Sequence, residues 1–285
     1  MWIASKLAMT KIFLFAFLFS VNLWAQTKEK ILIISDIDDT IKVSHVISYK
    51  SFNPIVLFRT WDTTTPFAGM ASLYQLILNE NPGVNQVAYL SNAPSAETGV
   101  EYLQNSHQTF LKSNNFPEGK LVLRDVIFDS EHKNKSIRKL VAEIQPTLVI
   151  MVGDNGENDV NVYEQARKEL NEQGIKNLIY IHQLYSSHDE DEAGKTLYPG
   201  QIGYATSVEI ALDLNMKALL SADSANWVYE HTVPYILSIR YSFLQVLKAI
   251  SFPTFKNCSD FKWVWPTDSH ENLPEFKKYV TKTCK

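Results

Sequence analysis

The sequence lacks any excess of basic residues: 27 Lys and Arg stand against 31 Asp and Glu, and the formal net charge is −4. A protein that binds nucleic acid needs a positively charged face to hold phosphates. A nucleic-acid partner is therefore not expected. Internal repeats and low-complexity segments are also missing. With 45% apolar and 12% aromatic residues, the chain can bury a sizeable core, which excludes general disorder.

An apolar stretch near the start is too short for a typical membrane span. It extends from Ile12 to Ala25, behind Lys6 and Lys11 and before Gln26, whereas a spanning helix needs about 20 apolar residues. Cations, a short apolar core and a small residue in this order are typical of a signal peptide. We expect the peptide to occupy residues 1–25 and the protein to be exported to the periplasm or the cell exterior. An uncleaved anchor is the alternative.

Cysteine is scarce, since the sequence holds only Cys258 and Cys284. Export would place both thiols in an oxidising compartment, where we expect them to form a disulfide. Two unrelated buried thiols are the alternative, because the sequence does not show that the pair meets.

Strand-like and helix-like stretches alternate along the first two thirds of the chain. Short apolar runs predict strands, and apolar residues at every third or fourth position predict helices. The expected strands are 31–35, 87–90, 121–123, 148–152 and 178–181, and the expected helices are 69–78, 96–113, 133–144 and 159–171. This alternation predicts an α/β fold, a Rossmann-like parallel sheet with helices on both faces.

Other stretches do not fit the alternation. Residues 41–66 are too long for a turn and predict a flap over the site, while the acidic stretch 188–195 predicts a solvated loop. After Pro199 we expect the alternation to stop and a mainly helical, aromatic C-terminal extension to follow, as a subdomain or a lid. The expected domains are therefore 26–199 and 200–285.

Acidic and polar residues follow the predicted strands, at the edge where parallel sheets bind their ligands. Asp36 and Asp38 follow the first strand, and Ser91 and Asn92 follow the second. The carboxylate pair suits phosphoryl transfer, because one can attack phosphorus while the other protonates the leaving oxygen. A calcium loop or simple turn acids are the alternatives for the pair alone. Ser91 could hold phosphate oxygens, or it could only cap a turn.

Cations and further acids come later in the chain. Lys133 and Lys135 open a predicted helix, where the helix dipole disfavours positive charge unless an anion lies near. Asp154 and Asp159 follow the fourth strand, and carboxylates facing Asp36 would repel it unless a divalent cation lay between them. Mg²⁺ is expected, because it prefers oxygen ligands and bridges to phosphate.

Together these segments resemble the motif set of the haloacid dehalogenase superfamily: Asp-x-Asp-x-Thr, a Ser or Thr at a strand end, a Lys, and Gly-Asp followed by another Asp. Residues 31–182 also resemble the catalytic domain of the App1-type phosphatidate phosphatases. The matching segments are 35–42, 67–70, 73–74, 89–94, 116–119, 132–133 and 153–159, with Tyr163.

The resemblance implies a magnesium-dependent phosphate monoester hydrolase that works through an aspartyl-phosphate. Asp36 would be the nucleophile and Asp38 the general acid and base. Ser91, Asn92 and Lys133 would bind the substrate phosphate.

The resemblance also implies a metal site. Asp36, the main-chain carbonyl of Asp38 and Asp154 would hold the ion, and Asp159 would orient the ligands from outside. The family pattern, His-Lys before a helix, selects Lys133 rather than Lys135.

Three departures from the family pattern concern the substrate: Ala93, Ser95 and His182 stand where a hydroxyl, an aromatic ring and an Arg are usual. A lipid phosphate at a membrane surface, phosphatidate above all, is the expected substrate. Soluble phosphate esters or phosphoproteins are the alternative. A binding module that kept the fold and lost catalysis is the alternative from another class.

Overall fold

The computed structural model describes residues 29–44, 65–81, 86–98, 101–126, 129–188, 194–239 and 257–285. Several expectations concern residues outside these ranges. They are the signal peptide 1–25, most of the flap 41–66, most of the acidic loop 188–195, and the stretch 240–250 of the expected helical extension.

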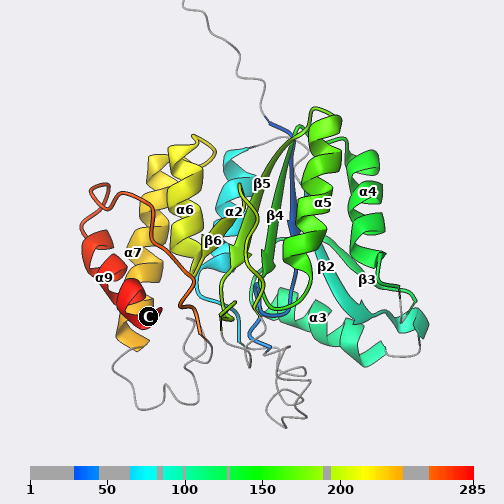
Figure 1. The fold of residues 1–285 in the computed structure, drawn as a ribbon, viewed down its shortest axis with the longest axis horizontal. Coiled ribbons are helices and arrows are strands. Elements are labelled where there is room, and N and C mark those ends of the chain that lie inside the picture. Colours follow the sequence, from blue (N-terminus) through cyan, green and yellow to red (C-terminus); the bar gives the residue numbers. More distant parts are fainter. Residues whose placement is uncertain are drawn as a thin grey trace, which may run out of the picture.

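A six-stranded parallel sheet forms the centre of the protein (Figure 1). Its strands are β1 (Ile31–Ser35), β2 (Gln86–Pro94), β3 (Lys120–Arg124), β4 (Leu148–Asp154), β5 (Lys176–His182) and β6 (Ile202–Tyr204). Their order in the sheet is β3-β2-β1-β4-β5-β6. The chain therefore leaves β1 in one direction and returns to its other side at β4, and sheets of this kind bind their ligands at the carboxyl ends of the strands that flank such a reversal. The predicted Rossmann-like α/β fold is confirmed.

Strand β1 is buried on both faces, as a central strand of a parallel sheet must be. Its sequence, Ile-Leu-Ile-Ile-Ser, is fully enclosed. Ile31 and Ile33 belong to one hydrophobic cluster, and Leu32 and Ile34 belong to the cluster on the opposite face. The strand therefore holds the adjoining Asp36 at a fixed place in the sheet.

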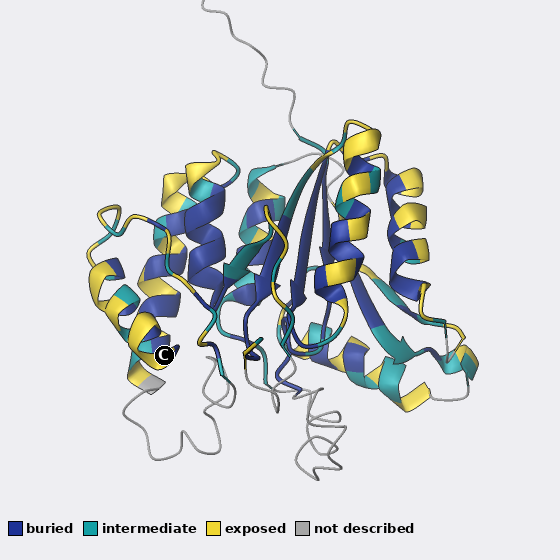
Figure 2. Ribbon diagram, viewed as in Figure 1, coloured by how far each residue is buried: buried dark blue, intermediate teal, exposed yellow. Residues whose placement is uncertain are grey.

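Helices cover both faces, with their outward sides exposed (Figure 2). Helices α4 (His132–Ile144) and α5 (Asp159–Glu172) pack on one face. The cluster on the other face takes residues from α2 (Met70–Glu80), α3 (Glu101–Ser113), α6 (Ser207–Met216), α7 (Ala222–Ile239) and α9 (Leu273–Thr283). Of the helices in the described ranges, none is both long enough and apolar enough to cross a membrane.

Most predicted elements end within a few residues of the observed ones, but two predictions differ from the structure. The expected helix 96–113 begins with a short 3₁₀ turn, Ala96–Thr98, and its α-helical part, α3, is described from Glu101. The alternation does not stop after Pro199, because β6 adds a sixth strand beside β5 and α6 follows it. Strand β6 has three residues, including Gly203, which is too short for an alternating pattern to be recognised.

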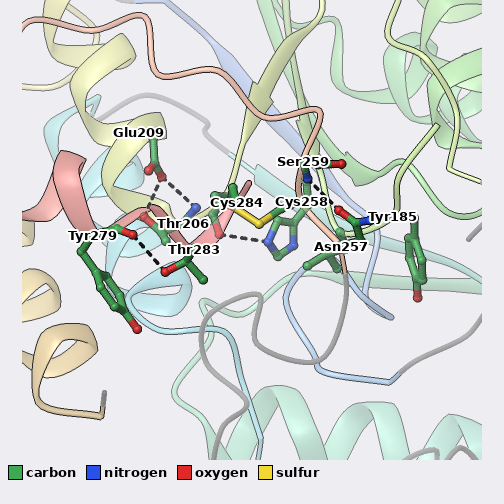
Figure 3. The surroundings of a disulfide bond; sticks show 12 residues. Tyr185, Thr206, Glu209, Asn257, Cys258, Ser259, Tyr279, Thr283 and Cys284 are labelled. Atoms are coloured by element: carbon green, nitrogen blue, oxygen red, sulfur yellow. Dashed lines mark hydrogen bonds between the residues drawn. A yellow bond between two sulfur atoms is a disulfide. The ribbon is translucent and has the colours of Figure 1, made fainter. Parts of the chain in front are cut away.

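The predicted disulfide is confirmed. Cys258 and Cys284 are joined with an S–S distance of 2.06 Å, so the alternative of two separate thiols is wrong. Figure 3 shows that the bridge lies near Thr206 and Glu209 of the α6 N-terminus and ties the end of α9 to the segment that begins at Asn257.

Candidate active site

The sequence-predicted residues gather at the carboxyl ends of β1, β2 and β4. Asp36 directly follows β1, and Asp154 is the last residue of β4. The backbone N–H of Asp36 donates a hydrogen bond to the carbonyl oxygen of Val152 in β4, at 2.9 Å. Ser91 lies inside β2 rather than after it, because this strand continues to Pro94 with a shift in its pairing to β3 beyond Leu90.

Three buried carboxylates form the centre of the site. Asp36, Asp154 and Asp159 each place one oxygen within 4.8 Å of the others. The Asp154 Oδ1 atom accepts hydrogen bonds from the backbone N–H groups of Gly156 at 2.6 Å and Glu157 at 3.2 Å. The Oδ2 atoms of Asp154 and Asp159 have no hydrogen-bond partner in the described part of the chain. These oxygens are a hard donor set of the kind that Mg²⁺ or Ca²⁺ prefers, so the residues present fit a divalent cation.

Lys133, in the first turn of α4, supplies a buried positive charge. Its Nζ atom donates a hydrogen bond to Asp36 Oδ1 at 2.7 Å and another to Asp159 Oδ1. Burial by itself lowers the pKa of Lys133, but the carboxylates of Asp159 and Asp36 outweigh it and hold the pKa well above its ordinary value. Lys135 instead lies 61% exposed and pairs with Asp129 at 2.9 Å. Of the two candidate lysines, the fold brings Lys133 to the acids.

The acids outnumber this cation. Burial raises the pKa of Asp36 well above its ordinary value, with Asp159 and Glu157 adding to the effect and Lys133 opposing it. Burial also raises the pKa of Asp154, and the charges of Asp159 and Asp36 raise it further. Ionising the whole cluster is therefore unfavourable unless further positive charge is present.

The side chain of Asp38 is held apart from this cluster. Its Oδ1 atom accepts a hydrogen bond from the Ser44 hydroxyl, and its Oδ2 atom lies 3.5 Å from Nε2 of His107. Burial raises the pKa of Asp38, but His107, Lys42 and the Ser44 hydrogen bond together hold it below the ordinary value. The Asp38 side chain is 22% exposed, which leaves it accessible to a substrate.

The two residues expected to bind phosphate from β2 already have partners within the protein. The Ser91 Oγ atom accepts a hydrogen bond from the backbone N–H of Ala93 at 3.0 Å and lies 3.5 Å from His107 Nε2. The Asn92 amide donates to Glu157 Oε2 at 3.3 Å. Through these contacts, Ser91 lies beside His107, which also contacts Asp38, and Asn92 lies beside Glu157.

Comparison with known families decides the identity. The model of the catalytic domain of phosphatidate phosphatase APP1 matches residues 31–183, which is more than half of the chain. The chain belongs to this family. No match was found among curated proteins or among solved structures. The match confirms the resemblance given by the motifs, and it makes the protein a phosphatase whose family implies a phosphorylated lipid as substrate.

The APP1 domain, as matched, begins at β1 and ends one residue after β5. It therefore contains all three clustered acids and Lys133. Strand β6 and helices α6, α7 and α9 lie beyond it, yet they contribute to the same hydrophobic cluster as β1 and α2.

One of the departures from the APP1 pattern lies away from the site surface. His182 is fully buried, and its ring nitrogens lie 2.9 Å from the carbonyl oxygen of Asp39 and 3.0 Å from that of Ala205. Its ring stacks on Tyr204 at a centroid distance of 4.7 Å. The His182 side chain therefore connects two loops inside the protein, and the effect of the missing Arg on substrate recognition stays a prediction.

Sequence reasoning missed three residues of the APP1 site. His107 on α3 contacts both Asp38 and Ser91, and Glu157 contacts Asn92. Asp39, the third, accepts a hydrogen bond from the hydroxyl of Tyr185 and fixes the loop after β1. A histidine on a helix carries no spacing signal of its own. Glu157 had a signal, because it lies between the two acids that follow β4.

Proposed function

We propose that this protein hydrolyses phosphate monoesters through an aspartyl-phosphate formed on Asp36, with phosphatidate or a related lipid phosphate as substrate. The observation that carries the proposal is the position of Asp36. Its carboxylate follows the central strand, lies beside two further buried acids, and receives a hydrogen bond from buried Lys133 at 2.7 Å.

In the first step, an oxygen of the Asp36 carboxylate forms a bond to phosphorus while the bond from phosphorus to the leaving oxygen breaks. The negative charge of the bound phosphate opposes the lowering of the Asp38 pKa, and the protonated Asp38 gives its proton to that oxygen, so the alcohol leaves neutral. In the second step, a water oxygen attacks the same phosphorus and its proton passes to Asp38. The acyl-phosphate bond breaks, which releases inorganic phosphate and restores the Asp36 carboxylate.

Lys133, Ser91 and Asn92 hold the phosphate during both steps. The Lys133 ammonium is fixed by Asp36 and Asp159, so it lies where negative charge must be stabilised. Preorganised donors of this kind are effective because they do not have to reorient during the reaction. The amide of Asn92 would exchange its contact with Glu157 for one with a phosphate oxygen.

We propose Mg²⁺ as the metal. Asp36, Asp154 and Asp159 have the carboxylate oxygens to hold it, together with the main-chain carbonyl of Asp38 that the resemblance implies. When bound, the ion would offset the negative charge of the acids and of the phosphate. Because the oxygen of Asp159 is grouped with the other two, we extend its expected role from orienting the ligands to being a candidate ligand.

The location and the domain division are part of the proposal. The disulfide between Cys258 and Cys284 supports an exported protein, because such bonds persist in oxidising compartments. We propose a phosphatase domain over residues 26–199 and a C-terminal extension over residues 200–285, whose strand β6 joins the sheet of that domain and whose helices pack against it.

The test is release of inorganic phosphate from phosphatidate in mixed micelles and from a panel of soluble phosphate esters. Activity should require Mg²⁺ and disappear with EDTA, and Asp36→Asn should lower kcat by at least about 10³-fold, the scale seen when a nucleophile is removed. Asp268→Asn, at an exposed loop position, is the matched control and should keep the wild-type rate.

Three results would contradict parts of this proposal. Full activity of Asp36→Asn would show that Asp36 is not the nucleophile. Undiminished turnover in EDTA would show that the reaction needs no metal ion. Turnover of the soluble esters with no turnover of phosphatidate would exclude the lipid substrate.

A further inference from the structure

Helix α3 buries a histidine on the side that otherwise packs against the core. His107 and Phe110 are its buried residues, with 1% and 0% exposure. Because they are three positions apart, they lie on the same face of the helix. Phe110 packs in the hydrophobic cluster. His107 instead points its imidazole at the polar residues of the site.

The His107 Nε2 atom makes two contacts with polar residues. It lies 3.5 Å from Oδ2 of Asp38 and 3.5 Å from Oγ of Ser91. Nδ1 is buried and has no hydrogen-bond partner among the described residues. A proton on Nδ1 would be unpaired, whereas a proton on Nε2 faces a carboxylate, so we assign the hydrogen to Nε2. Catalytic hydrogen bonds that are long without substrate often shorten in the complex.

These contacts fix Asp38 and Ser91 relative to one another. The Asp38 carboxylate is held at one oxygen by Ser44 and at the other by His107. The Ser91 oxygen accepts a hydrogen bond from the Ala93 N–H and shares the single Nε2 hydrogen of His107 with Asp38, so its own hydrogen is free to point at a phosphate oxygen. The imidazole of His107 thus sets the distance between Asp38, the proposed acid for the leaving group, and Ser91, a proposed donor to the phosphate.

We propose that His107 is a positioning residue that orients Asp38 toward the leaving oxygen and presents the Ser91 hydroxyl to the phosphate. The inference rests on the proposed role of Asp38 as general acid. Because His107 acts through Asp38, its loss should slow hydrolysis most for substrates whose leaving group needs a proton.

The experiment compares an alkyl phosphate, phosphatidate in mixed micelles, with p-nitrophenyl phosphate, whose leaving group departs without a proton. His107→Leu should lower kcat/KM, which reports the first phosphoryl transfer, by about 10- to 100-fold on phosphatidate, within the range of acid–base contributions. It should lower kcat/KM on p-nitrophenyl phosphate much less. His107→Gln, which restores an N–H donor, should recover most of the loss. Gln108→Leu, on the exposed side of α3, should behave as wild type.

Two outcomes would overturn the inference, both for variants that melt at the wild-type temperature. One is an equal fall in kcat/KM for both substrates in His107→Leu. The other is a His107→Gln variant no better than His107→Leu.

Asp38→Asn separates this inference from the proposed function. Full phosphatidate turnover by Asp38→Asn would show that Asp38 is not the general acid. It would contradict both the proposed mechanism and the positioning role of His107. Loss of turnover in Asp38→Asn, combined with wild-type rates in His107→Leu, would leave the proposed function intact and reject the positioning role alone.

Discussion

At the scale of single residues, Lys133 and Lys135 show how two identical side chains acquire opposite roles. They are two positions apart on α4, and two steps along a helix turn a side chain by about 200°. Lys133 is therefore enclosed between Asp36 and Asp159, while Lys135 is 61% exposed beside Asp129. The family pattern selected Lys133 correctly as the lysine near the acids.

Replacement of these lysines should have unequal effects. Lys133→Met leaves the acids without their buried partner, and breaking such a pair costs about 3–5 kcal/mol of unfolding free energy. We expect this variant to lose phosphatase activity and to be destabilised in metal-free buffer, with part of the stability restored by Mg²⁺. Lys135→Met breaks an exposed pair that water screens, so its loss should change stability little. Urea denaturation and phosphate release measure both, and equal effects of the two variants would contradict the buried role of Lys133.

The residues that sequence reasoning found and missed differ in a physical way. Asp36 and Asp154 could be predicted because each comes at the end of an apolar strand, and parallel strands bring their carboxyl ends together. His107 could not be predicted, because its contact with Asp38 depends on how α3 docks against the loop after β1. That docking is set by tertiary packing and leaves no local pattern in the sequence.

At the scale of elements, helix α6 begins with an unusually buried carboxyl group. Thr206 is its N-cap residue, and the Glu209 carboxylate accepts hydrogen bonds from the Thr206 N–H at 2.7 Å and hydroxyl at 2.6 Å. Glu209 Oε1 has no hydrogen-bond partner in the described ranges. Burial outweighs the hydrogen bonds and raises the pKa of Glu209 to about 7 from 4.5.

This shift makes folding stability depend on pH. Between pH 4.5 and about 7, Glu209 is ionised in the unfolded chain but protonated in the folded protein, so the unfolded state binds fewer protons and stability falls as pH rises. The loss is on the order of 3 kcal/mol across this window. Glu209→Gln removes the titration and should flatten this part of the profile. Unfolding free energies from urea titrations at pH 4 to 8 test it, and parallel profiles for the two proteins would contradict it.

Strands of the sheet were predictable to different degrees. β1 and β4 have continuous apolar runs because both of their faces are covered, and both were located closely. β6 has only three residues, of which Ile202 and Gly203 are partly exposed. Its place in the sheet follows from pairing with β5 rather than from its own composition.

At the scale of the whole molecule, the last described segment is joined to the site through a chain of contacts. Asp260 accepts a hydrogen bond from the Ser187 N–H at 2.6 Å. On the same loop after β5, Tyr185 donates to Asp39, next to Asp38. The disulfide between Cys258 and Cys284 holds the ends of this segment together across 26 positions.

Reduction of the disulfide should destabilise the protein. In the chain-entropy model, opening a loop of this length costs about 3.5 kcal/mol of unfolding free energy. A reductant should therefore shift the urea midpoint of the wild type downward, and the double variant Cys258→Ser and Cys284→Ser should match the reduced protein with or without reductant. Since the sequence has two cysteines, the variant is a complete control. An unchanged midpoint in reduced wild type would contradict the prediction.

The strand order also governs how the protein must be made. β1 pairs with β4 from Ile31 opposite Leu148, so one neighbour of this mostly apolar strand is synthesised long after it. At about 5–20 residues per second, ribosomes deliver that partner roughly 6–23 s later. During this interval β1 has an open edge of the kind that promotes aggregation. Nascent chains of this protein should therefore depend on chaperone protection until β4 emerges, and Asp36 cannot pair with Lys133 before α4 has been synthesised.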